Sequence, residues 1–157
     1  MPRGNHKVRK QVIQPDPRFN SIVLEKFINH AMYCGEKTVA RLVVYKALDI
    51  AEQKTGKQPM QLFSQALKNV SPAIEVKTKR VGGANYQVPV QVVGERKRFL
   101  AMKWMIQAAR TKKGKPMADR LAEEIIAASN NEGEAIKIKE TTVKQAEANR
   151  AFAYLAW

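Results

Sequence analysis

The chain has 157 residues, with 28 Lys or Arg and 14 Asp or Glu, so its formal net charge is +14 at neutral pH. This length suits one domain, and the positive charge favours a polyanionic partner, above all a nucleic acid. The longest uncharged stretch, residues 81–94, is interrupted by Gly82-Gly83 and Pro89 and is too short to span a bilayer, which excludes a membrane protein. The single cysteine, Cys34, supports neither an internal disulfide nor a Cys-rich metal cage, and a reducing cytoplasm is expected.

The positive charge is concentrated in separate segments of the chain. Residues 1–18 contain five basic residues and one acidic residue, and residues 95–115 contain eight basic residues and one acidic residue. Residues 119–147 have the opposite balance, with seven acidic and four basic residues. A single basic run is often no more than solvated surface, but separated clusters on one small domain favour a phosphate-binding face.

The first half of the chain is predicted to be helical after a basic arm. Residues 1–18 form the arm, and apolar residues three and four positions apart predict three helices over 19–71. The first helix ends at Gly35, the second starts at a Thr38 cap, and the third begins at Pro59. The apolar stripe expected to bury the second helix consists of Val39, Leu42, Val43, Ala47, Ile50 and Ala51.

Residues 73–93 are predicted to form one β-hairpin. Apolar and polar residues alternate from Ile74, Gly82-Gly83 supplies a turn with positive φ, and alternation resumes at Tyr86. Two strands alone are marginally stable in water, so the hairpin has to lean on the helices or become ordered on a partner.

Residues 95–157 are predicted to contain further helices and a C-terminal tail. Phe99 belongs to the buried stripe of the fourth helix, Pro116 opens the fifth, and capping-box spacing from Thr142 predicts the start of the last. The sequence therefore predicts a mainly α fold over residues 1–157. It is a single-domain bundle of about six helices, with one β-hairpin protruding between the third and fourth helices.

Residue types that carry catalysis or hold metals are not arranged in a site. Neither histidine has a Cys or His neighbour at metal-ligand spacing, and no glycine-rich loop follows a strand to cradle a phosphate. His30 is more typical of a helix boundary than of a catalytic base. The sequence therefore predicts no enzyme activity, no metal, no cofactor and no small-molecule substrate.

Three groups of cations instead suit a nucleic acid. The first precedes the glycine turn, the second recurs every seven residues on one face of the fourth helix, and the third follows as flexible point charges in a loop. Tyr86 could stack on a base, but packing within the hairpin is the more common role. The groups are Lys77, Lys79 and Arg80, then Arg96, Lys103 and Arg110, and finally Lys112, Lys113 and Lys115.

Several stretches of the sequence resemble the family of bacterial small-subunit ribosomal protein 7. They are PRG at 2–4, DPRF at 16–19 with the segment through Gly35, RVGGANYQVPVQV at 80–92, AAR at 108–110 and EANRAFA at 147–153. They occur in the family's order and cover essentially the whole chain. The resemblance implies a helical domain with a protruding hairpin that binds small-subunit rRNA in the head (the 3′ major domain) and nucleates head assembly.

The resemblance also implies a position in the cytoplasmic ribosome. Members of this family lie at the subunit interface, near mRNA and exit-site tRNA, and contact small-subunit ribosomal proteins 9 and 11. On this chain the hairpin tip expected to face mRNA and tRNA consists of Val81, Gly82, Gly83, Ala84 and Asn85. The uncharged tail expected to contact neighbouring proteins includes Phe152, Tyr154, Leu155 and Trp157.

The family's rRNA-binding positions fall mostly on cations of this chain. They are Arg3, Lys7, Arg9 and Lys10 of the arm, then Lys37, the hairpin residues Lys77, Lys79 and Arg80, and Arg96, Lys97, Lys103 and Arg110. The three loop lysines complete the predicted rRNA-binding set on charge alone. Two positions depart from the family pattern, because Glu36 stands where a basic residue is usual and Tyr154-Leu155-Ala156 replaces His-Tyr-Arg before the terminal Trp.

Two other classes of function share parts of this pattern. An architectural duplex-DNA binder would have a similar composition, and a preference for folded head RNA over equal-length duplex DNA at the same salt separates the two. An RNA-modifying enzyme would need a cofactor pocket or metal cluster, and the sequence offers neither. A structural rRNA-binding protein is therefore the favoured hypothesis.

Overall fold

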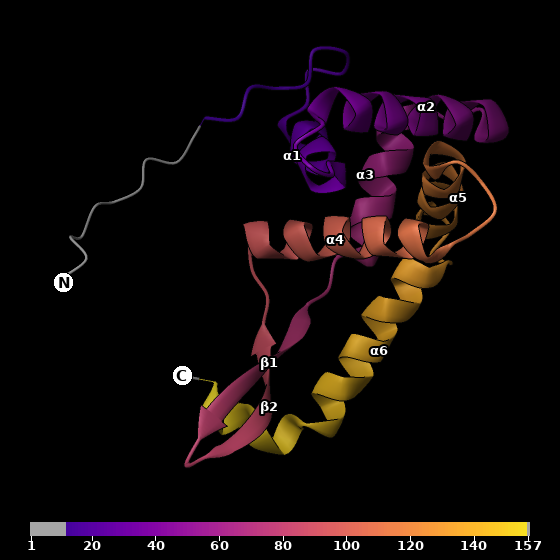
Figure 1. Cartoon of the computed structure of the whole chain (residues 1–157). Helices are drawn as coiled ribbons and strands as arrows, with labels where there is room; N and C mark the ends of the chain where they lie inside the picture. Colours follow the sequence, from indigo (N-terminus) through magenta and orange to yellow (C-terminus); the bar gives the residue numbers. More distant parts are fainter. Residues whose placement is uncertain (1–11, 157) are drawn as a thin grey trace, which may run out of the picture.

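The computed structural model describes residues 12–156 of the chain. In order, the elements are α1 (Ile22–Ala31), α2 (Lys37–Thr55), α3 (Pro59–Val70), β1 (Ile74–Val81), β2 (Ala84–Gln91), α4 (Glu95–Thr111), α5 (Met117–Ser129), α6 (Glu134–Ala148) and the 3-10 helix η1 (Arg150–Leu155). In Figure 1 helices α1, α2, α3 and α5 lie above α4, while the hairpin and α6 extend away below it. The predicted mainly helical fold, with one antiparallel hairpin between α3 and α4, is confirmed.

Apolar side chains from the helices α1 to α5 and from the start of α6 form one buried cluster. The rings of Phe27 and Phe63 meet edge to face at its centre, with centroids 5.0 Å apart. Helix α4 packs against α1, α3, α5 and α6. Burial of each large apolar side chain contributes about 1.5–3 kcal/mol. The face that α4 buries consists of Leu100, Ala101, Met102, Trp104, Met105, Ile106, Ala108 and Ala109.

The apolar stripe predicted for α2 is only partly correct. Val39 and Leu42 are 53% and 54% exposed. The buried face instead consists of Ala40, Val44, Ala47, Leu48 and Ala51. Helix α2 is apolar on two sides, and the buried side has three alanines, whose small side chains permit close approach of the helices packed against α2.

Two predicted helix starts are wrong. Helix α6 begins at Glu134, so Thr142 lies inside it, where the Thr142 hydroxyl donates to the Ile138 carbonyl at 2.8 Å. Threonine can satisfy its hydroxyl on the preceding turn of a helix, so the capping-box pattern also occurs within helices. Thr38 likewise lies inside α2, whose N-cap is Glu36.

The carboxylate of Glu124 joins α5 to the two neighbouring segments. Its side chain is fully buried, and it lies 2.7 Å from the Lys112 ammonium beyond the end of α4. Its Oε1 accepts the Ala135 backbone N–H at 2.8 Å in the first turn of α6. Gly133 has a φ of 97°, and a Cβ there would lie 2.9 Å from Oε1. The absence of a side chain at Gly133 therefore lets the carboxylate reach α6.

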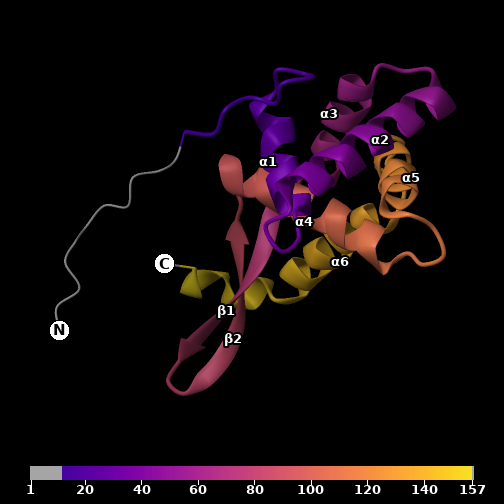
Figure 2. The ribbon, with the colours of Figure 1, turned by 45° about the horizontal axis from the view of Figure 1, so that its top comes forward.

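The hairpin is anchored at its base and exposed at its tip. Val81 pairs with Ala84, and Gly82 and Gly83 take φ values of 56° and 88°, as a two-residue turn with positive φ requires. Towards the base, Val88 and Val92 are buried. The tip lies beyond the helices, while α6 and η1 pack along the hairpin (Figure 2). Of the two expected alternatives, packing on the helices or ordering on a partner, the structure shows the hairpin packed on helices.

We expect Glu124→Ala to lower the free energy of unfolding by about 3 kcal/mol, because it leaves the Lys112 ammonium and the Ala135 N–H without their partner. Urea unfolding followed by circular dichroism measures this change. Glu134→Ala is the matched control, since Glu134 pairs with Lys137 three residues on at the exposed surface. Equal losses in the two variants would contradict a special role for the buried carboxylate.

Deletion of residues 81–85, with a short Asn-Gly closure, should leave the helical domain folded. All five residues of this tip are exposed, so the core loses no contact. The helical circular dichroism and the cooperative urea transition should persist. Val88→Ala, at the buried base of the same hairpin, should shift the urea midpoint down. A tip deletion that abolishes cooperative unfolding would show that the tip supports the core.

Candidate nucleic-acid interface

The basic stripe of α4 lies on the face opposite to its buried one. Arg96, Lys103 and Arg110 are all exposed and are separated by seven residues each, about two turns. Within the described residues, Lys103 makes no hydrogen bond or ion pair. Arg110 donates to the Ala31 carbonyl at the end of α1 at 3.3 Å. Lys97, on the same helix, is half-buried.

Arg96 differs from the other two cations because it is bound to a buried carboxylate. Its Nε and Nη2 donate to Glu75 Oε2 of β1 at 3.1 and 2.8 Å. Burial would raise the pKa of Glu75, but hydrogen bonds from Arg96 and Lys77 outweigh it and hold the pKa below its usual value. Glu75 is therefore ionised at neutral pH and offsets part of the Arg96 charge. Glu75 stabilises the fold at neutral pH, and this contribution is lost as the pH falls through the lowered pKa.

The hairpin cations lie on two different faces of the hairpin. Alternation along β1 puts Lys77 and Lys79 on one face and Arg80 on the other. The Lys77 Nζ lies 3.2 Å from Glu75 Oε1, and the Lys79 ammonium donates to the Leu155 carbonyl of η1 at 2.9 Å. Arg80 is exposed next to the turn. The structure therefore separates a group that the sequence alone had suggested as one cluster.

The lysines between α4 and α5 are less free than expected. Lys112 is paired with the buried Glu124, and Lys115 forms an ion pair with Glu123. The hydrogen bond from Lys115 lowers the pKa of Glu123. Lys113 is exposed in the same loop. The description of all three as flexible charges is therefore wrong for Lys112 and Lys115.

Lys37 lies at the first position of α2 and is tied to α1. Its ammonium is 2.5 Å from Glu25, a buried residue that also pairs with Arg41 at 3.3 Å. This cation therefore holds the two helices together. The other predicted rRNA-binding positions, Arg3, Lys7, Arg9 and Lys10 of the arm, lie outside the described residues.

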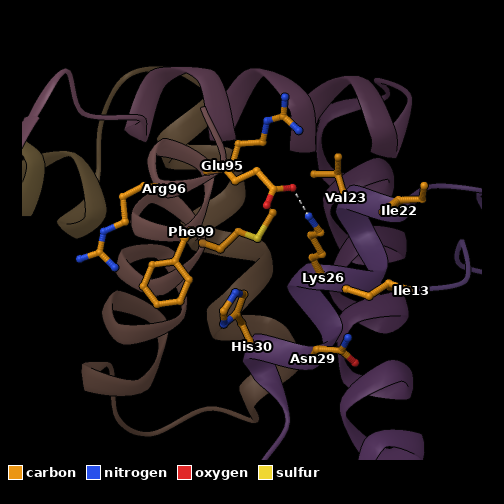
Figure 3. A pocket seen from close by; sticks show the side chains of 11 residues that line it. Ile13, Ile22, Val23, Lys26, Asn29, His30, Glu95, Arg96 and Phe99 are labelled. Atoms are coloured by element: carbon orange, nitrogen blue, oxygen red, sulfur yellow. Dashed lines mark hydrogen bonds and ion pairs between the residues drawn. The ribbon is translucent and has the colours of Figure 1, made fainter. Parts of the chain in front are cut away.

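The structure also reveals a groove between α1 and α4 that the sequence analysis did not identify. Its larger part has a volume of about 840 Å³ and includes Lys26, Asn29 and His30 from α1 and Arg98 and Phe99 from α4. Figure 3 shows His30 of α1 beside Phe99 of α4, with the Lys26–Glu95 ion pair between the helices. The spacing of residues 26, 29 and 30 on one helix face was visible in the sequence, but their helix partner was not.

The C-terminal tail folds onto the hairpin. The rings of Phe152 and Tyr86 lie 5.3 Å apart, and Leu155 is buried. Tyr86 therefore packs within the chain, as the more common role predicted. Tyr154 is 73% exposed, and Trp157 lies outside the described part of the chain. Of the described tail residues predicted to contact neighbours, Tyr154 is thus the most available.

Among residues 12–156, no cluster of three His, Cys, Asp or Glu side chains could hold a metal ion. In the same residues, no helix combines the length and the apolar character needed to cross a membrane.

Fold and surface together define a class, a small basic helical protein with an exposed cationic helix face and a projecting hairpin, as found in ribonucleoproteins.

Comparison with known proteins identifies the family. A family model described as "Ribosomal protein S7p/S5e" matches residues 2–150. "Small ribosomal subunit protein uS7" of Thermotoga maritima is 52% identical over 151 residues, which cover 96% of this chain and 97% of that protein. The protein of the same description from Chloroflexus aggregans is 53% identical over 154 residues and 98% of each chain. The chain belongs to the ribosomal protein S7p/S5e family.

Membership of this family makes the chain a ribosomal protein, which is a structural component and not an enzyme. The ribosome and its RNA are therefore its partners. The relatives are bacterial, and ribosomes of bacteria are in the cytoplasm, which agrees with the location expected from the sequence.

The contact between the tail and the hairpin predicts a local effect of Phe152→Ala. Loss of the Tyr86 contact should raise amide exchange in the outer halves of β1 and β2, because two strands alone are marginally stable. Hydrogen exchange with mass spectrometry measures this change. Tyr154→Ala is the control, since that ring is exposed and two residues away. Equal exchange in both variants would show that η1 does not brace the hairpin.

Proposed function

We propose that this structural constituent of the small ribosomal subunit binds the rRNA of the head directly, as a primary binder that nucleates head assembly. The phosphates lie along the outer face of α4, next to the groove that α4 forms with α1. We expect the exposed cations Arg80 and Lys113, together with the cations of the basic arm, to add further phosphate contacts.

The observation that carries this proposal is the arrangement of cations on α4. Lys103 and Arg110 are exposed two turns apart, and the buried face of the same helix fixes their direction. Cations that a rigid helix holds outward suit a phosphate backbone, because they need little ordering when the RNA binds. RNA helices are recognised largely through backbone and shape, which agrees with this arrangement.

We further propose that the hairpin tip faces mRNA and exit-site tRNA at the subunit interface. Residues 81–85 extend beyond the helices and are exposed, and they carry no acidic side chain that would repel RNA. The acidic part of the chain, residues 119–147, then faces solvent or basic neighbours. Small-subunit ribosomal proteins 9 and 11 are the proposed neighbours, and the exposed Tyr154 ring offers one contact.

The salt dependence of rRNA binding tests the proposed face. Log affinity falls as log salt rises, and each phosphate contact contributes about 0.7–0.9 to the steepness of this fall. Lys103→Gln combined with Arg110→Gln should therefore make the slope less steep by about 1.5. Filter binding of the full chain to an rRNA head fragment measures it. Arg96 is left in place, since its removal would also take two hydrogen bonds from the buried Glu75 and leave it with Lys77 alone.

Lys68→Gln combined with Lys144→Gln is the matched control, because these exposed lysines lie on α3 and α6. The control should keep the slope of the unaltered protein. An unchanged slope in the α4 variant would place the RNA on another face. Equal affinity for duplex DNA and for head RNA at one salt concentration would contradict rRNA as the specific partner.

A further inference from the structure

The groove between α1 and α4 consists of two adjoining pockets that share His30 and Phe99. The larger pocket, of about 840 Å³, continues past these two side chains into a pocket of about 430 Å³. The smaller one is lined by Lys103 and Arg110 of the basic stripe. The groove thus runs beside the proposed phosphate-binding cations, with an aromatic pair where its two parts meet.

The surface inside the larger pocket is mostly apolar, with Asn29 and His30 as its neutral polar groups. The apolar lining residues are Ile13, Ile22, Val23, Phe99 and Met102. The rings of His30 and Phe99 are half-buried and lie edge to face, with centroids 4.9 Å apart. The guanidinium of Arg96 lies 5.0 Å from the centroid of the Phe99 ring. Burial lowers the pKa of His30, so its imidazole is neutral at neutral pH. Asn29 also lines the larger pocket.

The rim of the groove is positively charged. Lys26 is paired with Glu95 at 2.6 Å, which leaves the excess charge to Arg98, Lys103 and Arg110. If a flat, weakly polar group enters the groove, an anionic group attached to it can reach the rim, where the cations attract it. Nucleotides have this combination, because a base with two polar edges is joined to a phosphate. An apolar side chain of a protein would bring no anion to these rim cations.

We propose that the groove between α1 and α4 holds one unstacked RNA base against Phe99 and His30, while the adjacent phosphates lie on Lys103 and Arg110. This inference rests on the proposed function and adds a base contact to its phosphate contacts. Asn29 and the neutral His30 offer hydrogen bonds to the base edge. The protein thereby prefers RNA with an unpaired nucleotide at this point over a continuous duplex.

Comparison of RNA with an abasic strand tests the base contact. The full chain is titrated by fluorescence anisotropy with a short single-stranded RNA and with an oligomer of the same sugar-phosphate backbone that lacks its bases. The unaltered protein should bind the RNA about tenfold more tightly, as expected for one stacked base. Phe99→Leu combined with His30→Ala should reduce that preference to less than threefold and leave the salt slope unchanged.

Phe19→Leu is a closely matched control. Phe19 is also half-buried, meets Tyr45 edge to face, and lies beneath Arg18 at 5.0 Å, but it lines neither pocket. This variant should keep the tenfold preference. Asn29→Ala, a second groove variant that removes no ring, should also weaken binding to RNA more than to the abasic strand.

The possible outcomes separate the two proposals. Equal affinities for RNA and the abasic strand, with a normal salt slope, would overturn the base contact and leave the phosphate contacts intact; this result is also expected if a protein side chain fills the groove. A preference that survives in both groove variants would place the base elsewhere. Absence of salt-dependent binding to the rRNA head fragment would instead contradict the proposed function itself.

Discussion

The burial of one face of α4 is the constraint on which the rest of the structure depends. Helices α1, α3, α5 and α6 all pack against this helix, and the hairpin leads directly into it. Because one side is fixed in the core, the cations on the other side have a fixed direction. The same packing sets α1 beside α4, so the groove and the basic stripe result from one hydrophobic arrangement.

Much of this fold is predictable from local patterns in the sequence. The pair Gly82-Gly83 correctly predicted the position of the hairpin turn, because a turn with two successive positive φ values strongly favours glycine. Pro59 correctly marked the start of α3. The face that α2 buries was not predictable in the same way, because Val39 and Ala40 are both apolar and the choice depends on how closely α5 approaches. The false cap at Thr142 shows the same limit for short motifs.

The candidate site was predictable as a set of cations but not as a set of contacts. The seven-residue spacing of Arg96, Lys103 and Arg110 correctly put them on one exposed face. Nothing in the sequence indicated that Glu75, 21 residues away, would bind Arg96. The groove was missed for a similar reason, because His30 and Phe99 meet only after α1 and α4 pack together. Tertiary contacts of this kind have no local sequence pattern.

Three buried glutamates divide the predicted rRNA-binding cations into two kinds. Glu25, Glu75 and Glu124 pair with Lys37, with Arg96 and Lys77, and with Lys112, respectively. Loss of such a cation removes an ion pair from a buried carboxylate, and a buried carboxylate that loses all of its partners costs about 3–5 kcal/mol. Weaker RNA binding by such a variant would then report on folding as much as on contact.

Lys103, Arg80 and Lys113 have no such partner within the described part of the chain, so their charge is available to phosphates. The paired cations therefore hold α1, α2, α4 and the hairpin in position, and the exposed ones attract the RNA. The chain has twice as many basic as acidic residues, so its cations repel one another. The ion pairs with buried glutamates offset this repulsion where the elements meet. The three buried glutamates are placed where elements meet, and the excess positive charge remains on the outer surface.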